Sequence, residues 1–174
     1  LIAQKLDVPE LIAWTEHELQ GYPDGVKVPA YRRVRGEVKS WNPYNGMMCA
    51  IIWTSEPPEH LVHRSAAQGV SELSDLIERH DSKGVLTMSF PEKTGYSLMK
   101  QSDMPTPPGL VVDRAQIVGI LDKVRSLVLD WTVKLESQGI MGENMTFSRE
   151  EKNKASKSTS IHIGTFQGIL GDVS

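Results

Sequence analysis

The chain has 174 residues, of which 39% are hydrophobic and 24% are charged, and this mix is typical of a globular domain with one core. Lysine and arginine number 19 and aspartate and glutamate 22, so the net charge of −3 gives no overall attraction to a phosphate backbone or an anionic membrane. One cysteine excludes an internal disulfide and a cysteine-based zinc cluster and favours the cytoplasm, and no apolar stretch reaches the ~20 residues that cross a bilayer. Because residues 1–6 already have the pattern of a helix end, we expect further sequence before Leu1.

The first complete element predicted along the chain is a helix that starts at Val8 and ends at Gly21. Asp7 and Glu10 stand at the spacing of a capping box, which satisfies free N–H groups at a helix N-terminus. Gly21 is placed to adopt the left-handed conformation that ends many helices. The apolar face of this helix is predicted to consist of Val8, Leu11, Ile12 and Leu19.

A β-hairpin is predicted after the loop of residues 23–30. Residues 31–41 combine two- and three-residue apolar spacings with Gly36, which predicts a strand with a bulge near that glycine. Residues 42–46 have the composition of a turn, and residues 47–53 form an apolar run. We therefore expect a second, more buried strand paired with the first.

The middle of the chain is predicted to alternate short helices and strands. A helix that ends at Gly84 is followed by a strand over residues 85–88, a short helix and a proline-rich loop over residues 102–109. The first of these helices is expected to bury one stripe of apolar side chains. The stripe consists of Ala66, Val70, Leu73 and Ile77.

The longest periodic segment is an amphipathic helix over residues 114–138. Its apolar residues return every three or four positions, so one face must pack against a core. Asp113 and Gln116 stand at capping-box spacing at its start. The predicted fold class is therefore α+β: a small mixed domain with an N-terminal helix, an antiparallel hairpin or sheet, this long helix and a C-terminal glycine-spaced strand.

Composition changes after Gly139. Residues 143–159 are almost wholly polar and small, which predicts a polar tether over residues 140–159, whereas residues 160–174 return to apolar residues spaced by glycines. We therefore divide the chain into a core over residues 1–139, a polar tether or exposed helix, and a C-terminal strand. As a free edge this strand would be a liability, so we expect it to dock on a partner or a second copy, with pairing inside its own sheet as the open alternative. The residues expected to make this contact are Ile161, Ile163, Phe166, Ile169 and Leu170.

Candidate catalytic and metal-binding residues are few. His60 and His63 are three residues apart and follow Glu59, whereas the zinc-protease helix needs histidines four residues apart with a glutamate between them. This spacing favours a surface segment and leaves a metal-dependent hydrolase as the alternative. Cys49 lies among apolar residues, which favours an inert buried thiol over a nucleophile. We therefore assign no catalytic residue, no metal ligand and no cofactor.

The strongest concentration of charge lies over residues 27–39, where five basic residues accompany one acidic residue. Arginines hold phosphates and aromatic rings stack on bases, so this segment is a candidate surface for nucleic acid or a nucleotide. Because alternate strand residues face opposite sides, Arg32 and Arg33 are expected to point apart, and the competing interpretation is a solvated face whose arginines pair with carboxylates. The candidate ligand-binding residues are Arg32, Arg33, Arg35, Lys39 and Trp41.

Three separated stretches carry a family resemblance. The first contains Leu11, Trp14, Glu18, Leu19, Gly21, Tyr22, Pro29, Tyr31 and Arg32. The second contains Trp131, Leu135, Gly139, Gly142, Phe147, Glu151 and Ala155, and the third contains Ile163, Gly164, Thr165, Phe166, Gly168 and Gly171. In order and spacing these residues resemble the AbiTii family, a domain of bacterial abortive-infection proteins that protect against phage.

The resemblance implies a non-enzymatic sensor or scaffold module in anti-phage defence, acting through self-assembly or through a defence-system partner protein. It brings no established catalytic residues. Two other functions stay open: a nucleic-acid or nucleotide binder that uses residues 27–39, and a metal-dependent hydrolase around His60 and His63. Because family members often extend further at both ends, we also expect sequence beyond Ser174.

Overall fold

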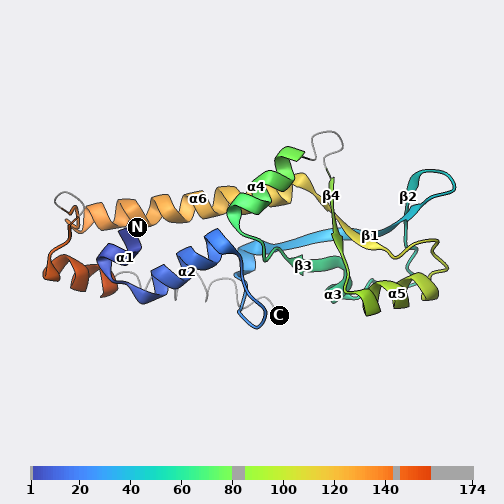
Figure 1. Ribbon diagram of the computed structural model, residues 1–174, viewed down its shortest axis with the longest axis horizontal. Coiled ribbons are helices and arrows are strands. Elements are labelled where there is room, and N and C mark those ends of the chain that lie inside the picture. Colours follow the sequence, from blue (N-terminus) through green and yellow to red (C-terminus); the bar gives the residue numbers. More distant parts are fainter. Residues whose placement is uncertain (1, 80–84, 143–145, 158–174) are drawn as a thin grey trace. The chain divides into compact units, whose positions relative to one another are not determined.

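The computed structural model describes residues 2–79, 85–142 and 146–157, and these form a mixed α+β fold, as the sequence predicts (Figure 1). The chain separates into two compact units, which we describe in turn. The helical unit comprises Leu1–Arg32, Ala67–Asp75 and Ile120–Ser174, and the sheet unit comprises Arg33–Ala66 and Leu76–Gly119. Within the described ranges, no helix combines the length and apolar character needed to cross a bilayer.

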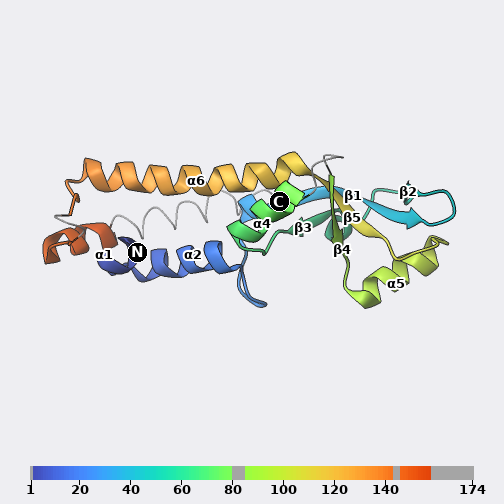
Figure 2. The same ribbon diagram turned by 45° about the horizontal axis from the view of Figure 1, so that its top comes forward.

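The helical unit contains α1 (Ile2–Leu6), α2 (Pro9–Gln20), the 3-10 helix η1 (Ala30–Arg32), the start of α4 (Val70–Arg79) and most of α6 (Arg114–Ser137). Figures 1 and 2 show α1 and α2 running beside α6. Residues 149–157 form a further helix of this unit. The core at this end consists of Ala3, Leu6, Val8, Leu11, Leu135, Ile140 and Ala155.

The start of α2 differs from the predicted capping box. Asp7 has a positive φ of 57°, and Val8 occupies the N-cap position without a side-chain hydrogen bond. Pro9 takes the first helical position, where its fixed φ fits and its missing N–H is not needed. Burial of Val8 therefore takes the place of a polar cap, because Val8 is fully buried in the core.

The predicted long helix is confirmed as α6, and Gly139 ends it as expected. Gly139 has a φ of 71°. Its N–H donates to the carbonyl oxygen of Glu136 at 2.9 Å, and the N–H of Ile140 donates to the carbonyl oxygen of Leu135 at 3.0 Å. These two bonds define a Schellman motif, in which a contact between two apolar side chains seals the helix end. Here that contact joins Ile140 and Leu135, which are both buried in the core.

Some residues after Gly139 belong to the core of the helical unit. A polar tether over residues 140–159 would not have such buried residues. Ile140 is 3% exposed and Ala155 is fully buried, and Phe147 packs against the same cluster. Three apolar residues of this segment thus pack against core residues of α1, α2 and α6, whereas Met141 is exposed. The boundaries at residues 139 and 159 stay predictions, and the predicted docking strand over residues 160–174 lies outside the described residues.

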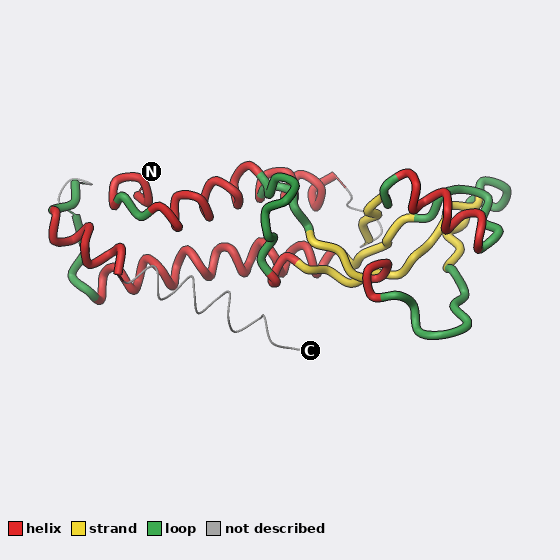
Figure 3. Tube along the Cα trace, turned by 90° about the horizontal axis from the view of Figure 1, so that it is seen from below, coloured by secondary structure: helices red, strands yellow, loops and turns green. Residues whose placement is uncertain are grey.

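Among the residues that the structure describes, the sheet unit holds five strands in antiparallel pairs, drawn in yellow in Figure 3. The long strand β1 (Arg33–Asn42) pairs with β3 (His63–Ser65) near its start, with β5 (Gly109–Asp113) through its middle and with β2 (Met47–Ala50) near its end. Strand β4 (Val85–Ser89) pairs with β5, so the order is β2-β1-β5-β4. Helices α3 (Glu59–Val62) and α5 (Glu92–Gln101) complete the unit, and the predicted hairpin is confirmed.

Gly36 serves a close approach between strands rather than the predicted bulge. Strand β1 keeps a continuous register with β5, from Gly36 opposite Val112 to Lys39 opposite Gly109. A Cβ atom at Gly36 would lie 2.8 Å from Cγ of Leu110 and closer still to the carbonyl oxygen of Val111. The two strands therefore leave no room for a side chain at this position.

The prediction that the second strand of the hairpin is more buried is wrong, because β2 is exposed at the edge of the sheet. Among the described strands it pairs with β1 alone, and Met47 is 62% exposed. Cys49 is half-buried rather than in the core. Within residues 47–53, only Ile51 is buried, so the apolar composition of this run belongs mainly to the surface.

Candidate functional site on the outer face of strand β1

Strand β1 presents candidate ligand-binding residues along its outer face. The even positions Val34 and Val38 are 1% and 2% exposed and point into the core, so the odd positions point outward. Trp41 ends the outward row and is 47% exposed. Four of the five predicted residues therefore share one face: Arg33, Arg35, Lys39 and Trp41.

Arg32 does not belong to this face. It lies in η1, in the helical unit, and its side chain is fully buried. Its guanidinium group pairs with the carboxylate of Glu18. A side chain enclosed in this way has no access to a ligand in solvent, so Arg32 leaves the candidate set.

Two of the three outward basic residues already pair with carboxylates. Arg33 Nη2 bonds to Oε1 of Glu59, and Lys39 Nζ lies 2.6 Å from Oε2 of Glu37. The hydrogen bond from Lys39, together with its charge, lowers the pKa of Glu37. Arg35, in contrast, forms no side-chain ion pair with the residues that the structure describes. The outer face thus matches the interpretation of a solvated, paired face more closely than that of a free basic surface.

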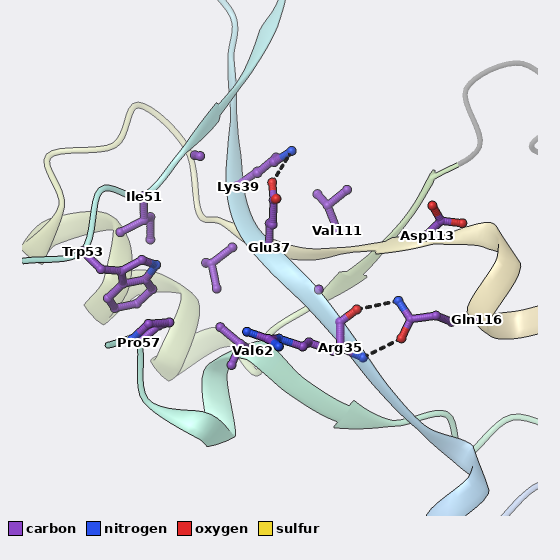
Figure 4. A pocket seen from close by; sticks show the side chains of 13 residues that line it. Arg35, Glu37, Lys39, Ile51, Trp53, Pro57, Val62, Val111, Asp113 and Gln116 are labelled. Carbon is purple, nitrogen blue, oxygen red and sulfur yellow. Dashed lines mark hydrogen bonds and ion pairs between the residues drawn. The ribbon is translucent and has the colours of Figure 1, made fainter. Parts of the chain in front are cut away.

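A groove of about 860 Å³ runs beside Arg35 and Lys39 (Figure 4). Its apolar side comes from the segment between β2 and β3, above all from Trp53 and Pro57. This volume suits a small ligand. The two cations are balanced by two acidic residues, so the lining has no net positive charge of the kind that favours phosphates. The charged lining residues are Arg35, Lys39, Glu37 and Asp113.

The side chain of Gln116 holds the backbone of β1 at Arg35. The N–H of Arg35 donates to Oε1 of Gln116 at 2.8 Å, and Nε2 of Gln116 donates to the carbonyl oxygen of Arg35 at 2.7 Å, as Figure 4 shows. The predicted capping box is therefore only half formed: Asp113 Oδ1 accepts from the N–H of Ala115 at 2.7 Å, but Gln116 bonds to β1 instead. This amide continues the pairing of β1 beyond the last residue of β5.

Large apolar side chains gather at the hairpin of β1 and β2. Trp41 and Met48 are direct cross-strand neighbours, Tyr44 in the turn is 90% exposed, and Ile52 just after β2 is 93% exposed. The turn is held by the side chain of Asn42, whose Oδ1 accepts from the N–H of Tyr44 at 2.9 Å. A cluster of exposed apolar residues typically marks a binding surface. We name this cluster the apolar hairpin patch: Trp41, Tyr44, Met48 and Ile52.

The two histidines of the predicted surface segment lie in different elements. His60 lies in α3 and is exposed, whereas His63 begins β3. In the part of the chain that the structure describes, no three His, Cys, Asp or Glu side chains are placed to hold a metal ion. The hydrolase hypothesis therefore gains no support from these residues.

A buried charge network lies in the helical unit. Glu18 in α2 is 3% exposed, and its Oε2 lies 2.5 Å from Nη2 of Arg32. The other oxygen, Oε1, accepts hydrogen bonds from the hydroxyls of Tyr22 at 2.5 Å and Tyr31 at 2.6 Å. Arg32 Nη1 also donates to the backbone carbonyl of Gln68 at 2.7 Å. Burying a charge costs free energy unless the charge is paired and hydrogen-bonded. The charges of Glu18 and Arg32 are both paired and hydrogen-bonded.

The apolar spacing predicts Leu19 on the buried face of α2, and this prediction is wrong. Leu19 is 58% exposed, and its neighbour Glu18 is buried. The sequence did contain a signal for Glu18, because Leu11 and Glu18 are seven residues apart, which places them on one helical face. A charged residue on such a face needs a buried partner, and Arg32 provides it. Glu18 and Arg32 thus neutralise each other inside the helical unit.

We expect the free energy of unfolding to fall above pH 10 because of Tyr22 and Tyr31. Burial, and then the hydrogen bond to Glu18, raise the pKa of both hydroxyls far above the ordinary value of 10.0. Near pH 10 the unfolded chain loses these protons while the folded chain keeps them. Stability is thus unaffected below pH 10 and declines above it, by at most about 2.7 kcal/mol per pH unit for two groups. Urea unfolding at pH 9, 10 and 11 measures this slope.

The control for this pH dependence is a pair of phenylalanine variants. Tyr22→Phe combined with Tyr31→Phe should flatten the decline, because neither titrating hydroxyl remains. Tyr44→Phe should keep the full decline, since Tyr44 is 90% exposed. An equal slope in all three proteins would show that the buried hydroxyls do not govern the alkaline behaviour.

The fold and the site together define a small α+β domain with a buried charge network in one unit and an exposed apolar sheet edge in the other. The chain belongs to the AbiTii family, whose model matches residues 1–160. No curated protein and no solved structure matches the chain. Membership of this family indicates a role in abortive-infection defence, as the resemblance in the sequence implied.

Proposed function

We propose that this chain is a non-enzymatic sensor or scaffold module of abortive-infection defence, which acts by binding a protein through the apolar hairpin patch. The observation that carries this proposal is the exposure of Tyr44 and Ile52, at 90% and 93%, beside an edge strand. Single exposed apolar residues are common on protein surfaces, but a cluster at a sheet edge is a risk of aggregation. A partner that covers the patch removes that risk.

The chemistry of the patch favours a protein partner. Strand β2 offers apolar side chains together with a backbone edge, on the side away from β1, with which no other described strand pairs. Both features are what an extended polypeptide recognises. The turn that carries Tyr44 is held by two hydrogen bonds, which the Oδ1 atoms of Asn42 and Asn45 accept from the N–H groups of Tyr44 and Met47, so the patch is already ordered before a partner arrives.

A nucleotide or nucleic acid has less support as the ligand. Arg32 is buried, and Arg33 and Lys39 are paired with Glu59 and Glu37. The groove beside them has no net positive charge, and the chain as a whole carries −3. Phosphate binding would have to compete with these ion pairs.

Phage plating on cells that produce the full chain tests the proposed function. We expect the chain to reduce plaque formation and the double variant Trp41→Ser, Met48→Ser to restore plaques to the level of cells without the protein, because the variant removes the apolar cross-strand pair. The matched control is Tyr96→Ser, since Tyr96 is 51% exposed on α5, outside the hairpin. This control should protect like the unmodified chain.

Circular dichroism and thermal unfolding establish that each variant is folded. Full protection by the folded double variant would contradict a role for the patch in defence. Equal loss of protection in the Tyr96→Ser control would contradict it as well, because the effect would then not be specific to the hairpin.

A further inference from the structure

The side of β2 that faces away from β1 can accept a partner as an added strand. In an antiparallel pair, successive residues alternate between bonding to the neighbouring strand and pointing their backbone groups outward. The N–H of Ile51 donates to the carbonyl oxygen of Val38 at 3.0 Å, so the alternation directs the backbone groups of Met48 and Ala50 away from β1. Among the described strands, none pairs with this side of β2. An extended segment can therefore add here as a further strand.

The C-terminal segment of the chain, residues 160–174, has the sequence that such an edge accepts. Ile161 and Ile163 alternate with a polar residue, so an added strand would carry them on one face. Trp41 and Met48 offer an apolar outer face beside it.

Charge also favours this pairing. Residues 160–171 and residues 46–53 contain no Lys, Arg, Asp or Glu. Charged residues, above all lysine, are the usual means by which proteins keep edge strands from pairing. Both segments lack this protection, and neither would bury a charge on docking.

We propose that residues 160–174 of one copy of the chain dock as an added strand on β2 of a second copy, which returns the same contact. This inference rests on the proposed function and names the protein partner as a second copy. The segment of 15 residues reaches roughly 50 Å when extended, which exceeds the roughly 13 Å of the four residues of β2. Reciprocal exchange between two identical chains covers both edges and closes the assembly at two copies.

The mass of the full chain in solution, measured by light scattering, tests this proposal. The unmodified chain should have twice the monomer mass of 19.4 kDa. Ile163→Lys charges the docking segment and Ala50→Pro removes an outward N–H without removing a bond to β1, so each should give a monomer. Thr159→Lys adds the same charge just before the segment and should remain a dimer.

Mixing the two monomeric variants identifies the mode of docking. The Ile163→Lys chain keeps its edge and the Ala50→Pro chain keeps its segment, so one contact re-forms and the doubled mass returns. If the segment docked within its own chain, the unmodified chain would be a monomer and mixing would change nothing. If two β2 edges paired directly, Ile163→Lys would stay dimeric. Either of these outcomes overturns the proposal.

A second edge variant covers the case in which Ala50→Pro does not fold. Met48→Lys charges the edge without changing the backbone, and circular dichroism decides which variant is used. Failure of the segment exchange can be distinguished from failure of the proposed function. A monomeric unmodified chain, with loss of protection in the Trp41→Ser, Met48→Ser variant, overturns only the exchange of segments. Full protection by that variant overturns the proposed function, whatever mass is measured.

Discussion

Replacing Glu18 with glutamine is expected to lower the free energy of unfolding by about 3–5 kcal/mol, because the change leaves the buried cation of Arg32 without a counter-charge. The amide also cannot accept hydrogen bonds from Tyr22, Tyr31 and Arg32 as a carboxylate does. Urea unfolding at pH 7, followed by circular dichroism, measures the loss.

Two further variants control this experiment. Asp122→Asn breaks an ion pair with Arg125 whose side chains are 62% and 72% exposed, so it should cost less than about 1 kcal/mol. Combining Glu18→Gln with Arg32→Met removes both buried charges and should recover part of the stability that Glu18→Gln loses. A loss in Glu18→Gln no larger than that in Asp122→Asn would show that the buried pair does not determine stability.

Gly36→Ala is expected to lower the free energy of unfolding by about 2–3 kcal/mol, because the new methyl group meets the backbone of β5. The neighbouring atoms are the carbonyl oxygen of Val111 and the branched end of Leu110. Backbone cannot move aside as a flexible side chain can, so β1 and β5 must separate locally. Urea unfolding of the variant measures the cost.

Gly119→Ala is the matched control for this substitution. Gly119 lies in α6, and a Cβ atom there meets nothing within 4 Å. Alanine favours a helix interior over glycine, so this variant should gain about 0.5–1 kcal/mol. The same chemical change is thus expected to have opposite effects at two positions. A loss of similar size at both would show that packing against β5 is not the cause.

Local periodicity was sufficient to predict the elements with the strongest patterns. The helix predicted over residues 114–138 is α6, Arg114–Ser137, because its apolar residues repeat over several turns and Gly139 stops it. The hairpin and the strand at residues 85–89 follow from apolar runs between turn residues. The family resemblance, carried by motifs at both ends of the chain, is also confirmed.

Burial of particular residues could not be predicted in the same way, because it depends on partners far away in the sequence. An apolar run such as residues 47–53 has the composition of a core strand, and only the sheet order places β2 at an edge. Glu18 is polar and yet buried, because Arg32 and two tyrosines converge on it from a later segment.

In the candidate site, too, local sequence predicts some features, whereas others depend on residues far away in the sequence. Strand alternation predicts that Arg32 and Arg33 point apart, whereas in the structure they separate because Arg32 lies in η1 and not in β1. Trp41 is a candidate ligand-binding residue in the sequence, but its place on the exposed face of β1 follows only from the structure. Pairing of Arg33 with Glu59 was open in the sequence, since the two residues are 26 positions apart. Trp53 and Gln116 had no local signal, because they reach the site through the loop after β2 and the start of α6.

The one cysteine of the chain lies in the edge strand β2, so a thiol-reactive probe can label the hairpin at a single site. Cys49 is half-buried in β2 and pairs in register with Ser40 of β1. Because these 174 residues contain no second cysteine, a maleimide dye can attach to them at one position only. Fluorescence from that dye would report directly on whether the edge of the sheet is occupied, without any engineered residue.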